Sequence, residues 1–103
     1  MTVHHVSQQD FDREVLQSPV PVVVDFYADW CGPCRALAPV LNEVASENAG
    51  AKVVKVNIDD SPQLATKYGV SAIPTLLVFH QGQVARVHQG LAGKEQIAGW
   101  LAG

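Results

Sequence analysis

The sequence has few cysteines: two in 103 residues, at positions 31 and 34. A disulfide between them would close a very small loop. Because the stabilisation from a crosslink grows with loop length, this pair is a poor brace for the fold. The chain also lacks an excess of basic residues, since seven Lys and Arg stand against ten Asp and Glu, for a formal net charge of -3. It therefore has no general attraction for phosphate backbones, and we expect no nucleic-acid partner.

Long apolar runs are also missing. No stretch of the sequence approaches the roughly 20 apolar residues that a membrane-spanning helix needs. The first ten residues have no basic segment followed by an apolar one, so they do not resemble a signal peptide. We therefore expect no membrane association and a cytoplasmic location. In that reducing compartment, a lone Cys-x-x-Cys is more often catalytic or metal-binding than structural.

The two cysteines lie in the segment Trp30–Cys34, of sequence Trp-Cys-Gly-Pro-Cys. The apolar, β-branched run Val20–Ala28 precedes it and the helix-like run Arg35–Leu41 follows it. This junction places the sulfur of Cys31 at a helix N-terminus, where free N–H groups and the helix dipole favour a thiolate. Redox chemistry is the leading hypothesis. The alternative is half of a zinc site, but the four histidines do not supply further ligands at the usual spacing, so we expect no metal.

The hydrophobic pattern predicts helices that alternate with strands, then a hairpin, then a last helix. Such alternation gives a parallel sheet with helices on both sides, and the hairpin adds antiparallel strands at one edge. We expect one α/β domain over residues 1–103. The predicted elements are a helix capped by Ser7 that ends before Ser18, strands over 20–28 and 52–58, a long helix that ends near 48–50, a short helix from Ser61 to Tyr68, a hairpin over 75–88, and a last helix around Ile97 and Leu101.

Three motifs closely resemble those of the thioredoxin family. In chain order they are Asp25, six residues before Cys31, the segment Trp30–Cys34, and Ile73-Pro74-Thr75. The resemblance covers nearly the whole chain. It implies the thioredoxin fold, a central five-stranded mixed β-sheet flanked by four helices. It also implies a general protein-disulfide reductase that carries no tightly bound cofactor and is re-reduced by a flavin-dependent thioredoxin reductase using NADPH. The chain departs from many bacterial members at Tyr27, where a second tryptophan is common.

The candidate catalytic residues are Cys31, Cys34 and Asp25. We expect Cys31 to be exposed at the helix start and to attack substrate disulfides as a thiolate. Cys34, one turn on and partly buried, would then attack Cys31 and release the reduced substrate. Asp25 is the only charged residue in an apolar strand, so its pKa should be raised and it could exchange a proton with Cys34. Lys55 on the neighbouring strand is either its charge partner or a solvated strand residue.

A candidate substrate-binding surface surrounds the cysteines. Ile73-Pro74 resembles the cis-proline loop of the family, which packs against the disulfide and offers backbone groups to an extended substrate. Between the sulfurs, Pro33 removes an N–H that could stabilise the Cys31 thiolate, which favours a reductant over an oxidant. The surface is expected to be flat and apolar, and its residues are Trp30, Gly32, Pro33, Ile73, Pro74 and Gly90.

Three functions remain to be separated. The first is a protein-disulfide reductase that donates electrons to reductive enzymes and acts on disulfide-containing proteins as a monomer. The second is a binding module that uses the same fold with incidental thiols, which the intact cysteine pair and Asp25 disfavour. The third is an oxidising or isomerising thiol enzyme, which Gly32-Pro33 and the absence of a leader pattern disfavour.

Overall fold

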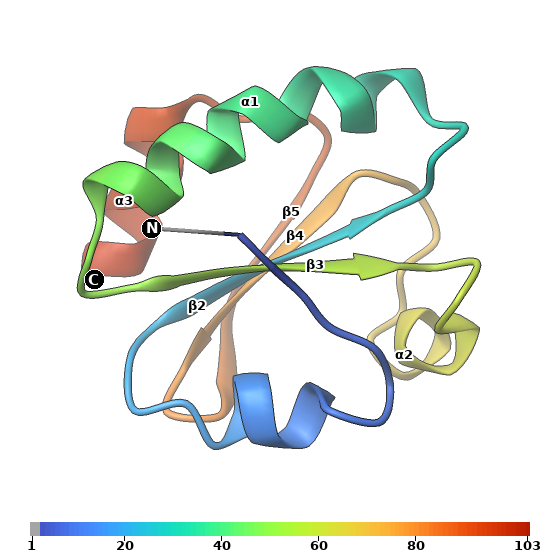
Figure 1. Ribbon diagram of the computed structural model, residues 1–103, viewed down its shortest axis with the longest axis horizontal. Helices are drawn as coiled ribbons and strands as arrows, with labels where there is room; N and C mark the ends of the chain where they lie inside the picture. The colour runs from blue at the N-terminus through green and yellow to red at the C-terminus, as the bar shows by residue number, and fades with distance from the viewer. Residues whose placement is uncertain (1–2) are drawn as a thin grey trace.

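The computed structural model describes residues 3–103 as a mixed β-sheet between two layers of helices (Figure 1). Its strands are β1 (His4–His5), β2 (Val22–Tyr27), β3 (Lys52–Asn57), β4 (Thr75–His80) and β5 (Gln83–Gln89). The helical segments within these residues are η1 (Asp12–Leu16, a π-helical turn), α1 (Gly32–Glu47), α2 (Pro62–Lys67) and α3 (Lys94–Ala102). Five strands and four helical segments confirm the fold class predicted from the sequence.

The sheet has the strand order β1-β3-β2-β4-β5. Strands β1, β3 and β2 run parallel, whereas β4 pairs antiparallel with both β2 and β5. Strand β2 is therefore central, and its residues Val22–Phe26 are all buried. This burial explains why β2 reads as a continuous apolar run, since a strand covered on both faces has no solvent side.

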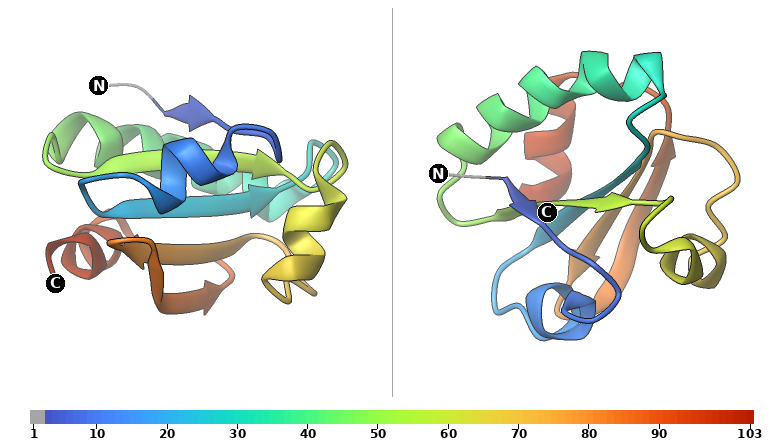
Figure 2. Two further views of the ribbon diagram at one scale, coloured as in Figure 1. Left: turned by 90° about the horizontal axis from the view of Figure 1, so that it is seen from below. Right: turned by 45° about the vertical axis from the view of Figure 1, so that its right-hand side comes forward.

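Each face of the sheet has its own core. Helices α1 and α3 cover one face, and η1 and α2 cover the other, as the two views of Figure 2 show. Alternation along a strand divides its side chains between the two cores. On β2, Val23 packs under α1 and α3, while Val22 and Val24 pack against η1 and α2. Asp25 shares the parity of Val23, so its carboxylate lies on the face that α1 covers.

The β4–β5 hairpin turns through two residues with positive φ, Gln81 at 53° and Gly82 at 80°. Such a pair fits the right-handed twist of a two-residue hairpin, as the turn signal in the sequence predicts. Strand β5 forms an edge of the sheet, and most of its residues are exposed.

The first predicted helix is wrong in extent. The N–H of Ser7 donates to Oδ1 of Asp10 at 2.7 Å, and the chain turns there before η1 begins at Asp12. This bond is one half of a capping box, the contact that a helix N-cap makes with the residue three positions on, so it agrees with Ser7 as the cap. Residues 8–10 nevertheless form turns, and the regular segment is shorter than predicted. The apolar residues of the segment, Phe11 and Val15, are buried as the pattern indicated.

Candidate active site

Cys31 and Cys34 form a disulfide at the N-terminus of α1. Strand β2 ends at Tyr27, and a short turn brings the chain to Cys31, which is the N-cap residue of the helix. The backbone N–H of Cys34 points at Sγ of Cys31, with 3.2 Å between nitrogen and sulfur. Pro33 has no N–H to add. In the reduced protein this single helix-terminal donor favours a thiolate on Cys31 over one on Cys34.

Both cysteines are buried in this oxidised state: Cys31 is 5% exposed and Cys34 2%. The expectation that Cys31 is exposed is therefore wrong for the disulfide form. The reason is tertiary, because the loop that carries Ile73 packs against the disulfide, and Sγ of Cys31 lies 3.9 Å from the carbonyl oxygen of Ile73. A substrate chain that binds beside Ile73 would therefore lie next to this sulfur.

Asp25 lies on central strand β2 with none of its surface exposed. Neither carboxylate oxygen has a hydrogen-bond partner among residues 3–103. Burial without partners disfavours the charged form and raises the pKa of Asp25 to about 7, and the positive charge of Lys55 opposes this rise. The carboxyl group thus changes its protonation near neutral pH on the face that carries Cys34.

Lys55 is the direct neighbour of Asp25 in the register of β2 and β3. Its ammonium nevertheless lies over the ring of Tyr27, with 4.3 Å from Nζ to the ring centroid. No carboxylate oxygen of residues 3–103 is within ion-pair distance of it. Of the two readings of Lys55 from the sequence, the structure supports neither in full: Lys55 acts on Asp25 by charge, but it binds an aromatic ring.

The Ile73–Pro74 peptide bond is cis, as the resemblance to the thioredoxin family implied. Pro74 accepts a hydrogen bond of 2.8 Å from the N–H of Gly90, so the loop before β4 and the loop after β5 are tied together beside the disulfide. Gly32 and Pro33 at the start of α1 are exposed next to them. The loops thus bring these predicted substrate-binding residues to one end of the sheet.

Trp30 is 67% exposed, the largest exposed fraction among the large apolar side chains of residues 3–103. Its Nε1–H donates to Oδ2 of Asp59 at 2.9 Å, which fixes the indole beside the disulfide loop. Sequence reasoning missed Asp59, which lies two residues after the end of strand β3. It also missed Leu91, which is 56% exposed and adjoins Gly90. The available signal in the sequence was a leucine directly after a predicted binding residue.

Within residues 3–103, no group of three or more His, Cys, Asp or Glu side chains is placed to hold a metal ion. Over the same residues, none of the helices has the length and apolar character needed to cross a bilayer.

A redox disulfide at a helix N-terminus, a cis-proline loop against it and a buried carboxyl group on the central strand define a thiol-disulfide oxidoreductase. The model of the thioredoxin family matches residues 2–103. The chain belongs to the thioredoxin family.

Curated relatives agree with this assignment over nearly the whole chain. A thioredoxin of Haemophilus influenzae is 44% identical over 100 residues, which cover 96% of this chain and 94% of the relative. Thioredoxin 1 of a Nostoc species is 49% identical over 94 residues, or 90% of this chain and 88% of the relative. A thioredoxin of Allochromatium vinosum is 44% identical over 101 residues, or 97% and 94%. The fold, the cysteine pair and the family together support dithiol-disulfide exchange as the chemistry of this protein.

Proposed function

We propose that this protein is a general protein-disulfide reductase that donates electrons to reductive enzymes, such as ribonucleotide or methionine sulfoxide reductases. The observation that carries the proposal is the contact between the Cys34 N–H and Sγ of Cys31, since it gives the two sulfurs unequal roles. The relatives, which are named thioredoxins, support disulfide exchange as the chemistry.

The reaction begins with the reduced protein. An extended substrate segment binds on the surface formed by Trp30, Gly32, Pro33, Ile73, Pro74 and Gly90. Trp30, Gly32 and Pro33 are exposed there, Ile73 and Gly90 are half-buried, and Pro74 is buried. The Cys31 thiolate attacks one sulfur of the substrate disulfide. A mixed disulfide forms on Cys31, and the other substrate sulfur leaves as a thiolate.

Release of the substrate from the mixed disulfide requires a thiolate on Cys34. Asp25, in its carboxylate form, takes the proton of the Cys34 thiol, directly or through water. The Cys34 thiolate then attacks Sγ of Cys31, the internal disulfide forms, and the second substrate sulfur leaves. Two electrons have passed from the protein to the substrate. The protonated Asp25 can return its proton when the disulfide is reduced again.

The cycle needs a source of electrons, and a flavin-dependent thioredoxin reductase that uses NADPH is the proposed one. The protein itself would hold no cofactor beyond the redox-active disulfide. We further propose that residues 1–103 form a single domain that acts as a monomer in the cytoplasm.

Reduction of insulin disulfides tests the proposal. The wild-type protein should accelerate it, both with a dithiol and with NADPH plus a thioredoxin reductase as the source of electrons. A double variant, Cys31→Ser with Cys34→Ser, is the matched control, because it keeps the fold and loses both sulfurs. If wild type and control give the same rate in both assays, the protein is a binding module with incidental thiols rather than a reductase.

A further inference from the structure

Three side chains, those of Asp25, Tyr27 and Lys55, lie together on the sheet face under α1. Asp25 and Tyr27 are two residues apart on β2, so they point to the same face, and Lys55 of β3 is the register partner of Asp25. Lys55 could reach toward either residue of β2. Its ammonium lies on the ring of Tyr27, 4.3 Å from the centroid, and the oxygens of Asp25 stay without a partner. The position of this one cation therefore depends on the aromatic ring.

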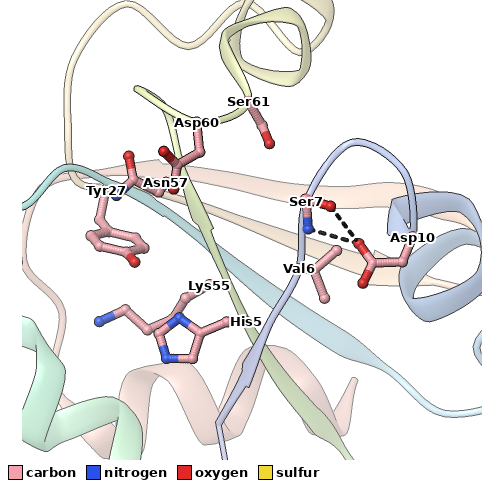
Figure 3. Close-up of a pocket in the computed structure, with 9 residues that line it drawn as sticks. All are labelled: His5, Val6, Ser7, Asp10, Tyr27, Lys55, Asn57, Asp60 and Ser61. Atoms are coloured by element: carbon pink, nitrogen blue, oxygen red, sulfur yellow. Dashed lines mark hydrogen bonds between the residues drawn. The ribbon is translucent and has the colours of Figure 1, made fainter.

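The pocket beside Tyr27 explains why the ammonium is stable there. Figure 3 shows the Tyr27 ring, the Lys55 side chain and the His5 ring on the same side of a cavity of about 190 Å³. The rings of His5 and Tyr27 meet edge to face, with 6.5 Å between centroids. Because this cavity opens to solvent, the ammonium keeps part of its water while the ring face binds it.

Moving the Lys55 ammonium from the Tyr27 ring to the Asp25 carboxylate would change the energy of the site in two opposite ways. The ion pair would gain Coulomb attraction, but both charges would lose water inside the core, and the two effects are of comparable size. A cation–π contact of ordinary strength is then enough to decide where Lys55 lies.

Other charged groups surround the same site. Asp60, after β3, lines the cavity shown in Figure 3. Burial raises the pKa of the Tyr27 hydroxyl, a hydrogen bond with the Asn57 side chain opposes this rise, and the negative charges of Asp29, Asp25 and Asp60 add to it. On the other side, a second cavity of about 140 Å³ is lined by Cys34 and Arg35 of α1 as well as by Tyr27 and Lys55. Arg35 is engaged elsewhere, because its Nη1 donates to the carbonyl oxygen of Asp29 at 2.8 Å. Lys55 is thus the cation that acts on Asp25.

We propose that Tyr27 is a positioning residue for the disulfide exchange: its ring holds the Lys55 ammonium off the Asp25 carboxyl group, which leaves Asp25 free to take up and release a proton. The inference rests on the proposed function in one respect, that the proton on Asp25 serves Cys34. The contact itself needs only the face of an aromatic ring, so the phenol oxygen of Tyr27 is dispensable.

The test is a carboxyl ¹³C NMR titration of Asp25 in four proteins: wild type, Tyr27→Phe, Tyr27→Leu and Lys55→Met. Tyr27→Phe keeps the ring and should titrate as the wild type does. Tyr27→Leu releases the ammonium toward Asp25 and should lower the titration midpoint by about one pH unit. Lys55→Met removes the cation and should raise the midpoint. A Tyr27→Phe variant that titrates like Tyr27→Leu would overturn the proposal.

The double variant, Tyr27→Leu with Lys55→Met, separates positioning from simple burial. If Tyr27 acts through Lys55, replacing the tyrosine should shift the midpoint far less when the lysine is absent. An equal shift in both backgrounds would mean that Tyr27 only shields Asp25 from water, and the proposal would be wrong.

A measurement on the wild type holds even if Tyr27→Leu fails to fold. The ε-methylene protons of Lys55 should resonate upfield because of the Tyr27 ring current, and they should do so in Tyr27→Phe as well. Unshifted protons would exclude the contact in solution. Neither NMR result uses a substrate, so a failure of Asp25 to assist Cys34 in kinetic assays would count against the proposed function and leave this inference standing.

Discussion

The backbone N–H of Gly90 donates a hydrogen bond of 2.8 Å to the carbonyl oxygen of Pro74. This bond joins the loop that packs against the disulfide to the loop that follows the edge strand β5. Gly90 has φ of +94°, a conformation that residues with a Cβ rarely adopt, and no atom beyond its chain neighbours lies within 4 Å of the site where a Cβ would be. The glycine is therefore required for backbone conformation rather than for space.

The first prediction concerns the variant Gly90→Ala. The alanine should destabilise the protein by about 1 to 2 kcal/mol, because it must either adopt a strained φ or shift the loop. A shifted loop would also weaken its bond to Pro74, so the KM for insulin should rise several-fold while kcat changes less. Denaturant unfolding and insulin-reduction kinetics measure the two effects.

The matched control is Gly69→Ala. Gly69 also has a positive φ, +67°, with nothing within 4 Å of its Cβ position, but it lies at the end of α2. Its loss of stability should be similar and its KM unchanged. If both variants raise KM equally, the effect of Gly90 is global destabilisation rather than a change in the binding surface.

The second prediction concerns the order of reactivity of the two cysteines. In the reduced protein, Cys31 should react with iodoacetamide near neutral pH much faster than Cys34, because the Cys34 N–H stabilises negative charge on the sulfur of Cys31. Mass spectrometry of the singly labelled protein identifies the site. In Cys34→Ser a mixed disulfide with substrate should accumulate on Cys31, whereas Cys31→Ser should trap none. Faster labelling of Cys34 would reverse the two roles.

The third prediction concerns the indole of Trp30, which Asp59 holds through a hydrogen bond of 2.9 Å. Asp59→Ala removes the acceptor. The bond is at the surface, so stability should fall by only about 0.5 to 1.5 kcal/mol. The mobile indole should weaken docking and raise the KM for insulin a few-fold. Asp59→Asn keeps an acceptor and should resemble the wild type.

Asp60→Ala is the control for this prediction, since Asp60 is an exposed carboxylate next in the chain that makes no contact with the indole nitrogen. If loss of negative charge alone weakened docking, Asp60→Ala and Asp59→Ala would raise the KM for insulin equally. That result would show that charge near the site, and not the position of Trp30, controls docking.

Much of the fold is local in origin and was predictable. The apolar run of β2, the proline at the start of α2 and the turn at Gln81-Gly82 each determine their own element. The start of the first helix was less predictable. The bond between Ser7 and Asp10 is one that a helix N-cap forms, yet residues 8–10 form turns and the regular segment η1 begins at Asp12. The spacing of the apolar residues does not decide where the helix becomes regular.

The features of the active site likewise fall into some that could be predicted from the sequence and some that could not. The sequence predicted the sulfurs of Cys31 and Cys34 at a helix start and a buried Asp25, and the resemblance to the thioredoxin family implied the cis bond before Pro74. It could not predict the burial of Cys31, which depends on a loop more than 40 residues away in the chain. Nor could it predict that Lys55 binds a ring instead of a carboxylate, because one residue of β3 faces two alternatives on β2.

The fourth prediction concerns stability and Asp25. The pKa of the carboxyl group is about 7 in the folded protein against an ordinary value of 3.8. Below the lower value both states are protonated, and Asp25 has no effect. Between the two values the unfolded chain releases the proton while the folded protein keeps it, so stability falls as pH rises. Above about pH 7 both states are ionised, and the loss of stability is complete at roughly 4 kcal/mol.

Asp25→Ala and Asp25→Asn should therefore be more stable than the wild type at pH 8 by up to roughly 4 kcal/mol, less the cost of the cavity or of the unpaired amide. The gain should shrink toward pH 4. Asp29→Asn, at an exposed position near the end of β2, is the control and should stay within about 0.5 kcal/mol of the wild type. Urea unfolding at a series of pH values measures all three. A gain that is the same at pH 4 and pH 8 would mean that the variants repack the core and that ionisation of Asp25 costs the folded protein nothing. Asp25→Ala and Asp25→Asn should also resolve the mixed disulfide more slowly between pH 6 and 8, because each substitution removes the group that accepts the proton of Cys34.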